Sequence, residues 1–140
     1  MSDGEAIQQL INTYSQAASL GEWDRAVGTY LPEGVWAIPH LSMTLEGAAA
    51  IRSALTAFME TMDYVLQMNA PAIIHVEGDR ATATSSIREA GKSKGEMHAF
   101  EFLGLYEDEL VHTAEGWKFA RRTFRGIGTS HFPLESGEKH

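Results

Sequence analysis

The chain has 140 residues, no cysteine and a formal net charge of −8 at pH 7. The lack of cysteine excludes disulfides, zinc–thiolate sites, iron–sulfur clusters and thiol nucleophiles, and the acidic balance argues against a nucleic-acid partner. With 44% hydrophobic and 21% charged residues, the sequence has the composition of one ordinary globular domain. No apolar run is long enough for a membrane span and no signal pattern opens the chain, so we expect a cytoplasmic protein that binds no membrane.

Three helical patterns occupy the first part of the chain. Ser2 and Glu5 make a capping-box pattern ahead of an apolar stripe that ends at Gly21, since glycine takes the left-handed cap conformation at low cost. A second, short stripe covers residues 23–30. The third and strongest stripe covers residues 51–62. The sequence therefore predicts three N-terminal helices.

Strand patterns dominate the rest of the chain. Two short strands are predicted at residues 35–38 and 41–45, between the second and third helices. Beyond Asp63 the apolar period changes to two, which is typical of strands. The strands predicted there cover residues 64–76 with an interruption near Pro71, 81–90, 97–111 and 117–127, and a glycine-rich turn or loop lies at 91–95.

Helices followed by an antiparallel meander predict an α+β domain. We expect a cone in which three N-terminal helices pack on one face of a strongly curved, mostly antiparallel sheet. This domain would span residues 1–128, followed by a loosely ordered polar tail at residues 129–140. Apolar residues remain on the open face of the sheet, so we expect a homo-oligomer through that face.

The order of several short segments resembles the SnoaL-like group of the nuclear transport factor 2-like superfamily. The segments that carry this resemblance are residues 7–14, 21–24, 46–52, 78–81 and 116–119. The resemblance implies a cone of helix and curved sheet around a hydrophobic pocket. Its members include polyketide cyclases, ketosteroid isomerase, scytalone dehydratase, limonene epoxide hydrolase, hexachlorocyclohexane dehydrochlorinase and non-catalytic binding proteins, so the fold alone does not choose a function.

The catalytic positions of these relatives are only partly matched. In the dehydratases and dehydrochlorinases an Asp and a His do the chemistry, and these positions fall on Ser19 and near Val65, neither of which can abstract a proton. In ketosteroid isomerase the tyrosine donor falls on Tyr14, but the base falls on Ile38 and the second acid on the apolar residues 103–105. The resemblance therefore implies a pocket that lacks two familiar sets of catalytic residues.

Four residues remain as candidates for catalysis. Tyr14 lies on the inward stripe of the first helix, where its phenol needs a ligand oxygen or a core carbonyl as partner. His40 lies near the rim of the expected cone and could carry a proton, although a lone histidine is more often a surface or structural residue. An inward Glu89 beside apolar walls would have a raised pKa and act as a general base, whereas an exposed Glu89 would pair with an Arg or Lys across the strand. His98 shares a strand face with Tyr106, and alternation leaves open which face looks inward.

Substrate contacts are expected from apolar and neutral polar side chains. Gln67 and Asn69 share one face of a strand and could orient a substrate oxygen or bond neighbouring loops. The large apolar side chains that suit either the walls of a pocket for a flat ligand or an ordinary core are Trp36, Phe58, Met59, Met62 and Phe100. No pair of histidines has metal-ligand spacing and no nucleotide-binding motif is present, so we expect neither a metal nor a cofactor.

Two functions are consistent with these features. The first is a cofactor-independent lyase, dehydratase or isomerase that performs acid–base chemistry on a small hydrophobic, aromatic or polyketide-like molecule in an apolar pocket. The second is a non-catalytic ligand-binding or dimerisation module, which the missing acids and bases favour. An ionisable side chain inside the pocket would favour the enzyme, and a closed pocket or one with only neutral polar groups would favour the module.

Overall fold

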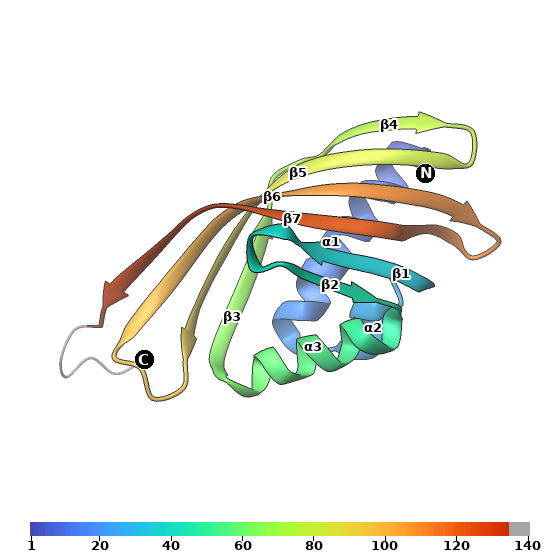
Figure 1. Cartoon of the computed structure of the whole chain (residues 1–140). Coiled ribbons are helices and arrows are strands. Elements are labelled where there is room, and N and C mark those ends of the chain that lie inside the picture. Colours follow the sequence, from blue (N-terminus) through green and yellow to red (C-terminus); the bar gives the residue numbers. More distant parts are fainter. Residues whose placement is uncertain (135–140) are drawn as a thin grey trace.

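The structure is a computed structural model that describes residues 1–134 (Figure 1). None of the helices in this part of the chain is long and apolar enough to cross a membrane. Its elements are α1 (Asp3–Leu20), α2 (Trp23–Val27), β1 (Tyr30–Ile38), the 3-10 helix η1 (Pro39–Leu41), β2 (Met43–Glu46), α3 (Ala48–Glu60), β3 (Met62–Asn69), β4 (Ile73–Glu77), β5 (Arg80–Ser93), β6 (His98–Thr113) and β7 (Gly116–Pro133).

The strands form one sheet in the order β2-β1-β7-β6-β5-β3, and β3 and β4 pair one after the other with the same edge of β5. Neighbouring strands are antiparallel except β1 and β7, which are parallel. The long strands arch over the helices, which lie on the concave side of the sheet (Figure 1). The predicted α+β cone of three helices and a curved, mostly antiparallel sheet is therefore confirmed.

Helix α1 forms as its sequence predicts. The Ser2 hydroxyl accepts a hydrogen bond from the backbone N–H of Glu5 at 3.1 Å, and Gly21 ends the helix with a φ of 73°. Between these caps the apolar stripe faces the sheet, where Ile7 and Ile11 are fully buried. Each such side chain stabilises the fold by about 1.5–3 kcal/mol, so this face holds α1 against the sheet.

The second and third helices end earlier than predicted. Helix α2 stops at Val27 and Tyr30 opens β1, while α3 stops at Glu60 and Met62 opens β3. The Thr61 hydroxyl donates to the carbonyl of Phe58 at 2.6 Å and helps to close α3. Tyr30 and Met62 continue the helical spacing of apolar residues, but each is already the first residue of a strand. Between them, residues 39–41 form η1, so the strand predicted at 41–45 begins only at Met43.

Strands β5 and β7 extend beyond the predicted boundaries. Gly91 lies inside β5, where an added Cβ would come within 2.7 Å of the Tyr64 carbonyl oxygen and 2.8 Å of the Phe100 ring. This glycine therefore permits close packing, and the turn itself is made at Gly95, with a φ of 79°. Strand β7 continues to Pro133, so residues 129–133 pair with β6 and are not loosely ordered. The rest of the predicted tail, residues 135–140, lies outside the described residues.

A buried ion pair joins β6 and β7 in the core. The Arg122 side chain is fully buried, and its Nε and Nη2 donate to the two carboxylate oxygens of Asp108 at 2.7 and 3.1 Å. The guanidinium also lies over three aromatic rings, 3.8 Å from the centroid of Tyr106, 4.2 Å from Phe119 and 4.9 Å from Tyr14. Burial by itself would lower the pKa of Arg122, but the Asp108 carboxylate raises it above its ordinary value, so the guanidinium remains charged.

Removing one member of this pair should be costly. Arg122→Met leaves the Asp108 carboxylate buried without its cation, and we expect the free energy of unfolding in urea to fall by about 3–5 kcal/mol. The double variant Arg122→Met/Asp108→Leu should recover most of this loss, because no lone charge remains. Arg88→Ala, which removes an exposed ion pair with Glu101, should cost less than about 1 kcal/mol. Equal losses for Arg122→Met and Arg88→Ala would contradict a structural role for the buried pair.

Candidate functional site

A pocket of about 220 Å³ lies between α3, the η1 turn and the concave face of the sheet. Six strands, η1 and α3 contribute to its wall. The lining residues are Trp36, Ile38, His40, Leu41, Met43, Ala54, Leu55, Phe58, Gln67, Glu89, Phe102, Tyr106 and Phe124. The pocket is mostly apolar and aromatic, with a few polar groups, which is typical of small-molecule sites.

The aromatic wall is set by strand alternation. Phe102 and Tyr106 occupy inward positions of β6, and Phe124 on β7 lies opposite Tyr106, with ring centroids 5.2 Å apart. Trp36 on β1 and Phe58 on α3 complete this wall. Three strands and one helix, far apart in the sequence, therefore supply aromatic rings to the wall of one cavity.

Glu89 brings a carboxyl group into this apolar pocket. It occupies an inward position of β5, and the side-chain amide of Gln67 on β3 donates a hydrogen bond to its carboxylate at 3.0 Å. Burial raises the pKa of Glu89 above its ordinary value, and the bond from Gln67 works against that rise. The backbone N–H of Gln67 in turn donates to the Ser19 hydroxyl of α1 at 2.9 Å, which fixes this part of β3. A carboxylate with a raised pKa in an apolar site is the arrangement that proton transfer requires.

Tyr106 belongs to both the pocket and the core. Its ring lines the pocket and also receives the Arg122 guanidinium, 3.8 Å from the ring centroid. Burial, and then the neighbouring Tyr14, hold the pKa of Tyr106 well above its ordinary value. Its phenol therefore stays neutral and can act as a hydrogen-bond donor.

His40 lies at the opening of the pocket. It is an exposed residue of η1, and its ring packs on Phe124 with centroids 5.9 Å apart. Trp36, His40, Phe58, Gln67 and Glu89 are thus the sequence-predicted site residues that the structure brings together around one cavity.

The other predicted site residues lie elsewhere. Tyr14 is fully buried in the core and takes no part in the pocket wall; burial raises its pKa to about 12, so it is a neutral core phenol. Asn69 donates from its side-chain amide to the Ser15 hydroxyl and so joins β3 to α1. Phe100 is buried beside Gly91, and Met59 on α3 does not reach the lining. None of these four side chains lines the pocket.

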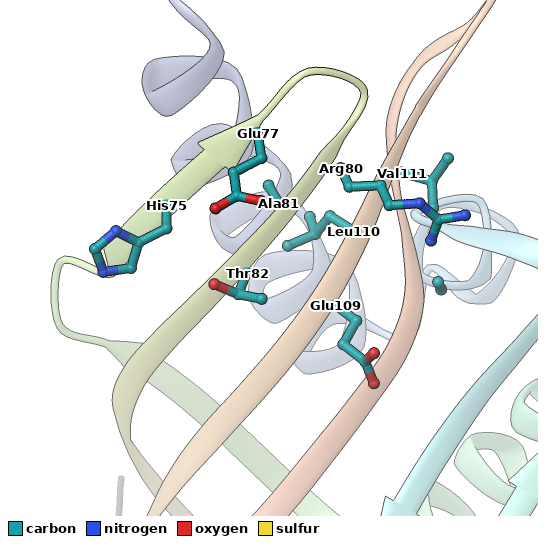
Figure 2. A pocket seen from close by; sticks show the side chains of 9 residues that line it. His75, Glu77, Arg80, Ala81, Thr82, Glu109, Leu110 and Val111 are labelled. Atoms are coloured by element: carbon teal, nitrogen blue, oxygen red, sulfur yellow. The ribbon is translucent and has the colours of Figure 1, made fainter.

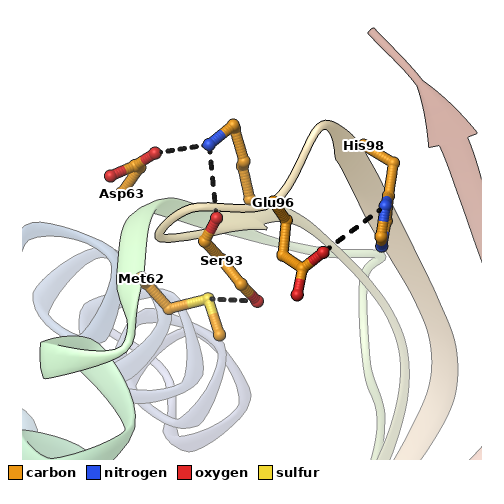
Figure 3. A network of polar contacts seen from close by, with 6 residues as sticks. Met62, Asp63, Ser93, Glu96 and His98 are labelled. Carbon is orange, nitrogen blue, oxygen red and sulfur yellow. Dashed lines mark hydrogen bonds and ion pairs between the residues drawn. The ribbon is translucent and has the colours of Figure 1, made fainter.

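His98 and Met62 lie beyond the pocket, near the turn between β5 and β6 (Figure 3). The His98 ring lies against that of His131, with centroids 5.1 Å apart, and its Nδ1 is 3.7 Å from the Glu96 carboxylate. The Met62 sulfur accepts from the Ser93 hydroxyl at 3.9 Å. His98 lies on the same face of β6 as Tyr106, but it is the first residue of this long strand, and that end of the strand extends beyond the cavity.

Sequence reasoning missed eight lining residues, which are Ile38, Leu41, Met43, Ala54, Leu55, Phe102, Tyr106 and Phe124. The sequence did carry a signal for Phe102 and Tyr106, since they lie on the same strand face as Phe100, which was predicted to line the pocket. Phe124 had none, because its place opposite Tyr106 depends on the register of β6 and β7.

A second depression, of about 240 Å³, lies over β4, β5 and β6 (Figure 2). Its ionisable side chains, His75, Glu77, Arg80 and Glu109, are all exposed. No three His, Asp or Glu side chains within residues 1–134 are grouped as metal ligands. The pocket around Glu89, by contrast, holds a carboxyl group whose pKa is raised by burial, so it is the candidate site.

The hydrogen bond from Gln67 makes the Glu89 carboxyl a sensitive reporter of this site. Gln67→Leu removes a donor that favours the ionised form, so we expect the pKa of Glu89 to rise further. The midpoint can be followed by NMR of the carboxyl carbon as the pH is varied. Asn69→Ala, on the same strand face but bonded to Ser15, should leave that midpoint unchanged. An unchanged midpoint in Gln67→Leu would show that the amide does not act on Glu89.

Comparison with known proteins agrees with this geometry. The model of the SnoaL-like domain matches residues 1–123. No curated protein matches the sequence. Among solved structures, a protein of Novosphingobium aromaticivorans named as an aromatic ring hydroxylase is 24% identical with a TM-score of 0.85, covering 92% of both chains. A protein of the same organism named as a scytalone dehydratase is 18% identical with a TM-score of 0.83, covering 97% of this chain and 94% of that one.

The type 2 hexachlorocyclohexane dehydrochlorinase LinA is 14% identical with a TM-score of 0.84, covering 97% of this chain and 91% of that one. At these identities the neighbours establish the fold, while the matched domain establishes the family. The resemblance carried by the short segments is thereby confirmed. The chain belongs to the SnoaL-like domain family, within the nuclear transport factor 2-like superfamily.

Proposed function

We propose that the pocket binds a small hydrophobic, aromatic or polyketide-like molecule and that Glu89 transfers a proton on it without a cofactor. The observation that supports this most directly is the Glu89 carboxyl itself, which lines an apolar pocket and has its pKa raised by burial. Such chemistry is of the lyase, dehydratase or isomerase type. Structural neighbours named as a dehydratase and a dehydrochlorinase agree with this class of reaction.

The proposed reaction begins at a carbon next to a carbonyl group. The Glu89 carboxylate takes a proton from that carbon, the electron pair of the C–H bond becomes a carbon–carbon double bond, and the π pair of the carbonyl moves to its oxygen as an enolate forms. Glu89 then returns the proton to another carbon, which isomerises the molecule, or gives it to a departing hydroxyl, which leaves as water. Tyr106 is the neutral phenol in the wall that could bond the enolate oxygen, with the Arg122 cation behind its ring.

The size of the pocket limits the substrate. An apolar cavity of about 150 Å³ holds one benzene molecule, so a pocket of about 220 Å³ suits one or two fused rings. Trp36 from the sheet and Phe58 from helix α3 contribute flat aromatic rings to the pocket wall. We infer a one-ring or two-ring substrate.

A non-catalytic binding module is the second candidate function. Ser19 stands where the dehydratases have an acid, and its hydroxyl donates to the Ser15 carbonyl at 2.8 Å while accepting from the N–H of Gln67. This serine therefore has a structural role. The experiment below separates the two functions.

Proton exchange on a ketone probe tests the catalytic proposal. We expect the wild-type protein to speed the exchange of the acidic C–H protons of 2-tetralone for deuterium in D₂O, followed by NMR. Glu89→Gln keeps the shape of the pocket but removes the base, so the exchange rate should fall about 100-fold while the affinity changes little. Glu109→Gln, the same substitution on the exposed face of β6, should keep the wild-type rate. Binding of 2-tetralone without exchange faster than in acetate buffer would favour the binding module.

We also infer that two copies associate through the outer face of the sheet. Tyr64, Leu66 and Met68 alternate outward along β3 and are exposed, and Leu103 on β6 lies in register with Met68 two strands away, across Arg88 of β5. Exposed apolar patches of this kind support self-association.

Sedimentation velocity tests this association. The wild-type protein should sediment as a dimer and Leu66→Glu as a monomer, because a charge in the apolar contact disfavours pairing. Leu20→Glu, at an exposed leucine near the end of α1, should remain dimeric. A wild-type monomer at micromolar concentration would refute the inference.

A further inference from the structure

The imidazole of His40 is held over a glycine at the mouth of the pocket. A Cβ added at Gly126 of β7 would lie 3.3 Å from Cε1 of His40 and 3.5 Å from both ring nitrogens. The ring thus occupies the space that any larger residue at position 126 would fill. Its other neighbour is the Phe124 ring, with centroids 5.9 Å apart. Gly126 and Phe124 together form a seat for His40.

The seat depends on a second glycine. A Cβ at Gly104 of β6 would come within 2.7 Å of the Phe124 ring and 2.8 Å of the Arg125 carbonyl oxygen. Gly104 pairs with Gly126, whereas Leu103 pairs with Gly128, so Ile127 is an extra residue that makes a bulge in β7. The bulge and the two glycines bring Phe124 into the pocket wall and leave room for His40 above it.

We propose that His40 contacts the polar end of the bound molecule and that Gly126 is the positioning residue that places it there. This inference rests on the proposed function, because it concerns a ligand in the same pocket. Glu89 and Gln67 supply polar groups from β5 and β3, and His40 supplies another from η1 at the opening. The ligand class that meets both sets is a one-ring or two-ring molecule with oxygen atoms at two opposite ends.

His40 reaches the mouth of the pocket because of the short turn in which it lies, and no sequence motif around it signals this position. His40 follows Pro39, which sits in the first turn of η1, and Ser42 ends that helix with a φ of 52°. This short turn carries the imidazole from the end of β1 towards β7. Since imidazole both donates and accepts hydrogen bonds, it suits a hydroxyl, a carbonyl or a carboxylate on the ligand.

A pair of probes that differ by one hydroxyl tests the inference. We expect 2,6-dihydroxynaphthalene to bind the wild-type protein about fivefold more tightly than 2-naphthol, which is the effect of one added hydrogen bond. His40→Phe keeps the aromatic ring but loses the bond, so this fivefold preference should disappear. Gly126→Val displaces the imidazole and should also abolish the preference.

Gly128→Val is the matched control, because an added Cβ at Gly128, two residues along β7, meets no atom within 4 Å. It should keep the fivefold preference, as measured by titration calorimetry. Equal weakening of both probes in Gly126→Val, or a preference that survives in His40→Phe, would overturn the role of His40. A wild-type protein that binds neither probe would instead overturn the proposed function of the pocket.

Discussion

The ion pair between Arg122 and Asp108 is the constraint on which the rest of the structure depends. Two charges in a dry core are tolerated only when they face each other with good geometry, and the two parallel hydrogen bonds allow little freedom between β6 and β7. Aromatic rings fill the space around the cation and exclude water. The register of these two strands, and hence which of their side chains face the helices, is fixed by this contact.

The pocket lies next to this ion pair, on the other side of the Tyr106 ring. Tyr106 separates the charged core from the cavity, and Phe124 beside it is placed by the same pairing of strands. Glu89 lies on the neighbouring strand, where the largely apolar surroundings reduce the contact of its carboxyl group with water. Tyr106 thus packs against the buried ion pair of the core and also forms part of the wall of the pocket.

Much of the fold could be predicted because local patterns repeat along this chain. The stripe of α1 and the alternation along β5 both follow from the period of apolar residues, but that alternation left open whether Glu89 faces the pocket or is exposed. The pattern failed at the junction of α3 and β3, because Met62 continues the apolar spacing of the helix although it is already the first residue of the strand. It also could not show how far each strand extends past the cavity. His98 and Phe100 share a face with Tyr106, yet the length and bend of β6 carry them away from the site, and the seat of His40 depends on a bulge that no local pattern reveals.

The parallel pairing of β1 with β7 has a consequence for how the molecule forms. Tyr30 pairs with Phe119, so β1, which pairs locally with β2, gains its second neighbour in the sheet only when β7 has been made. Closing a loop of that length costs chain entropy before any contact repays it, and such topologies fold slowly. During synthesis on the ribosome, α1 and β1 emerge early, but the cavity has no complete wall until β7 has left the exit tunnel. The wall of the cavity is therefore completed late, when β1 and β7 pair inside the sheet.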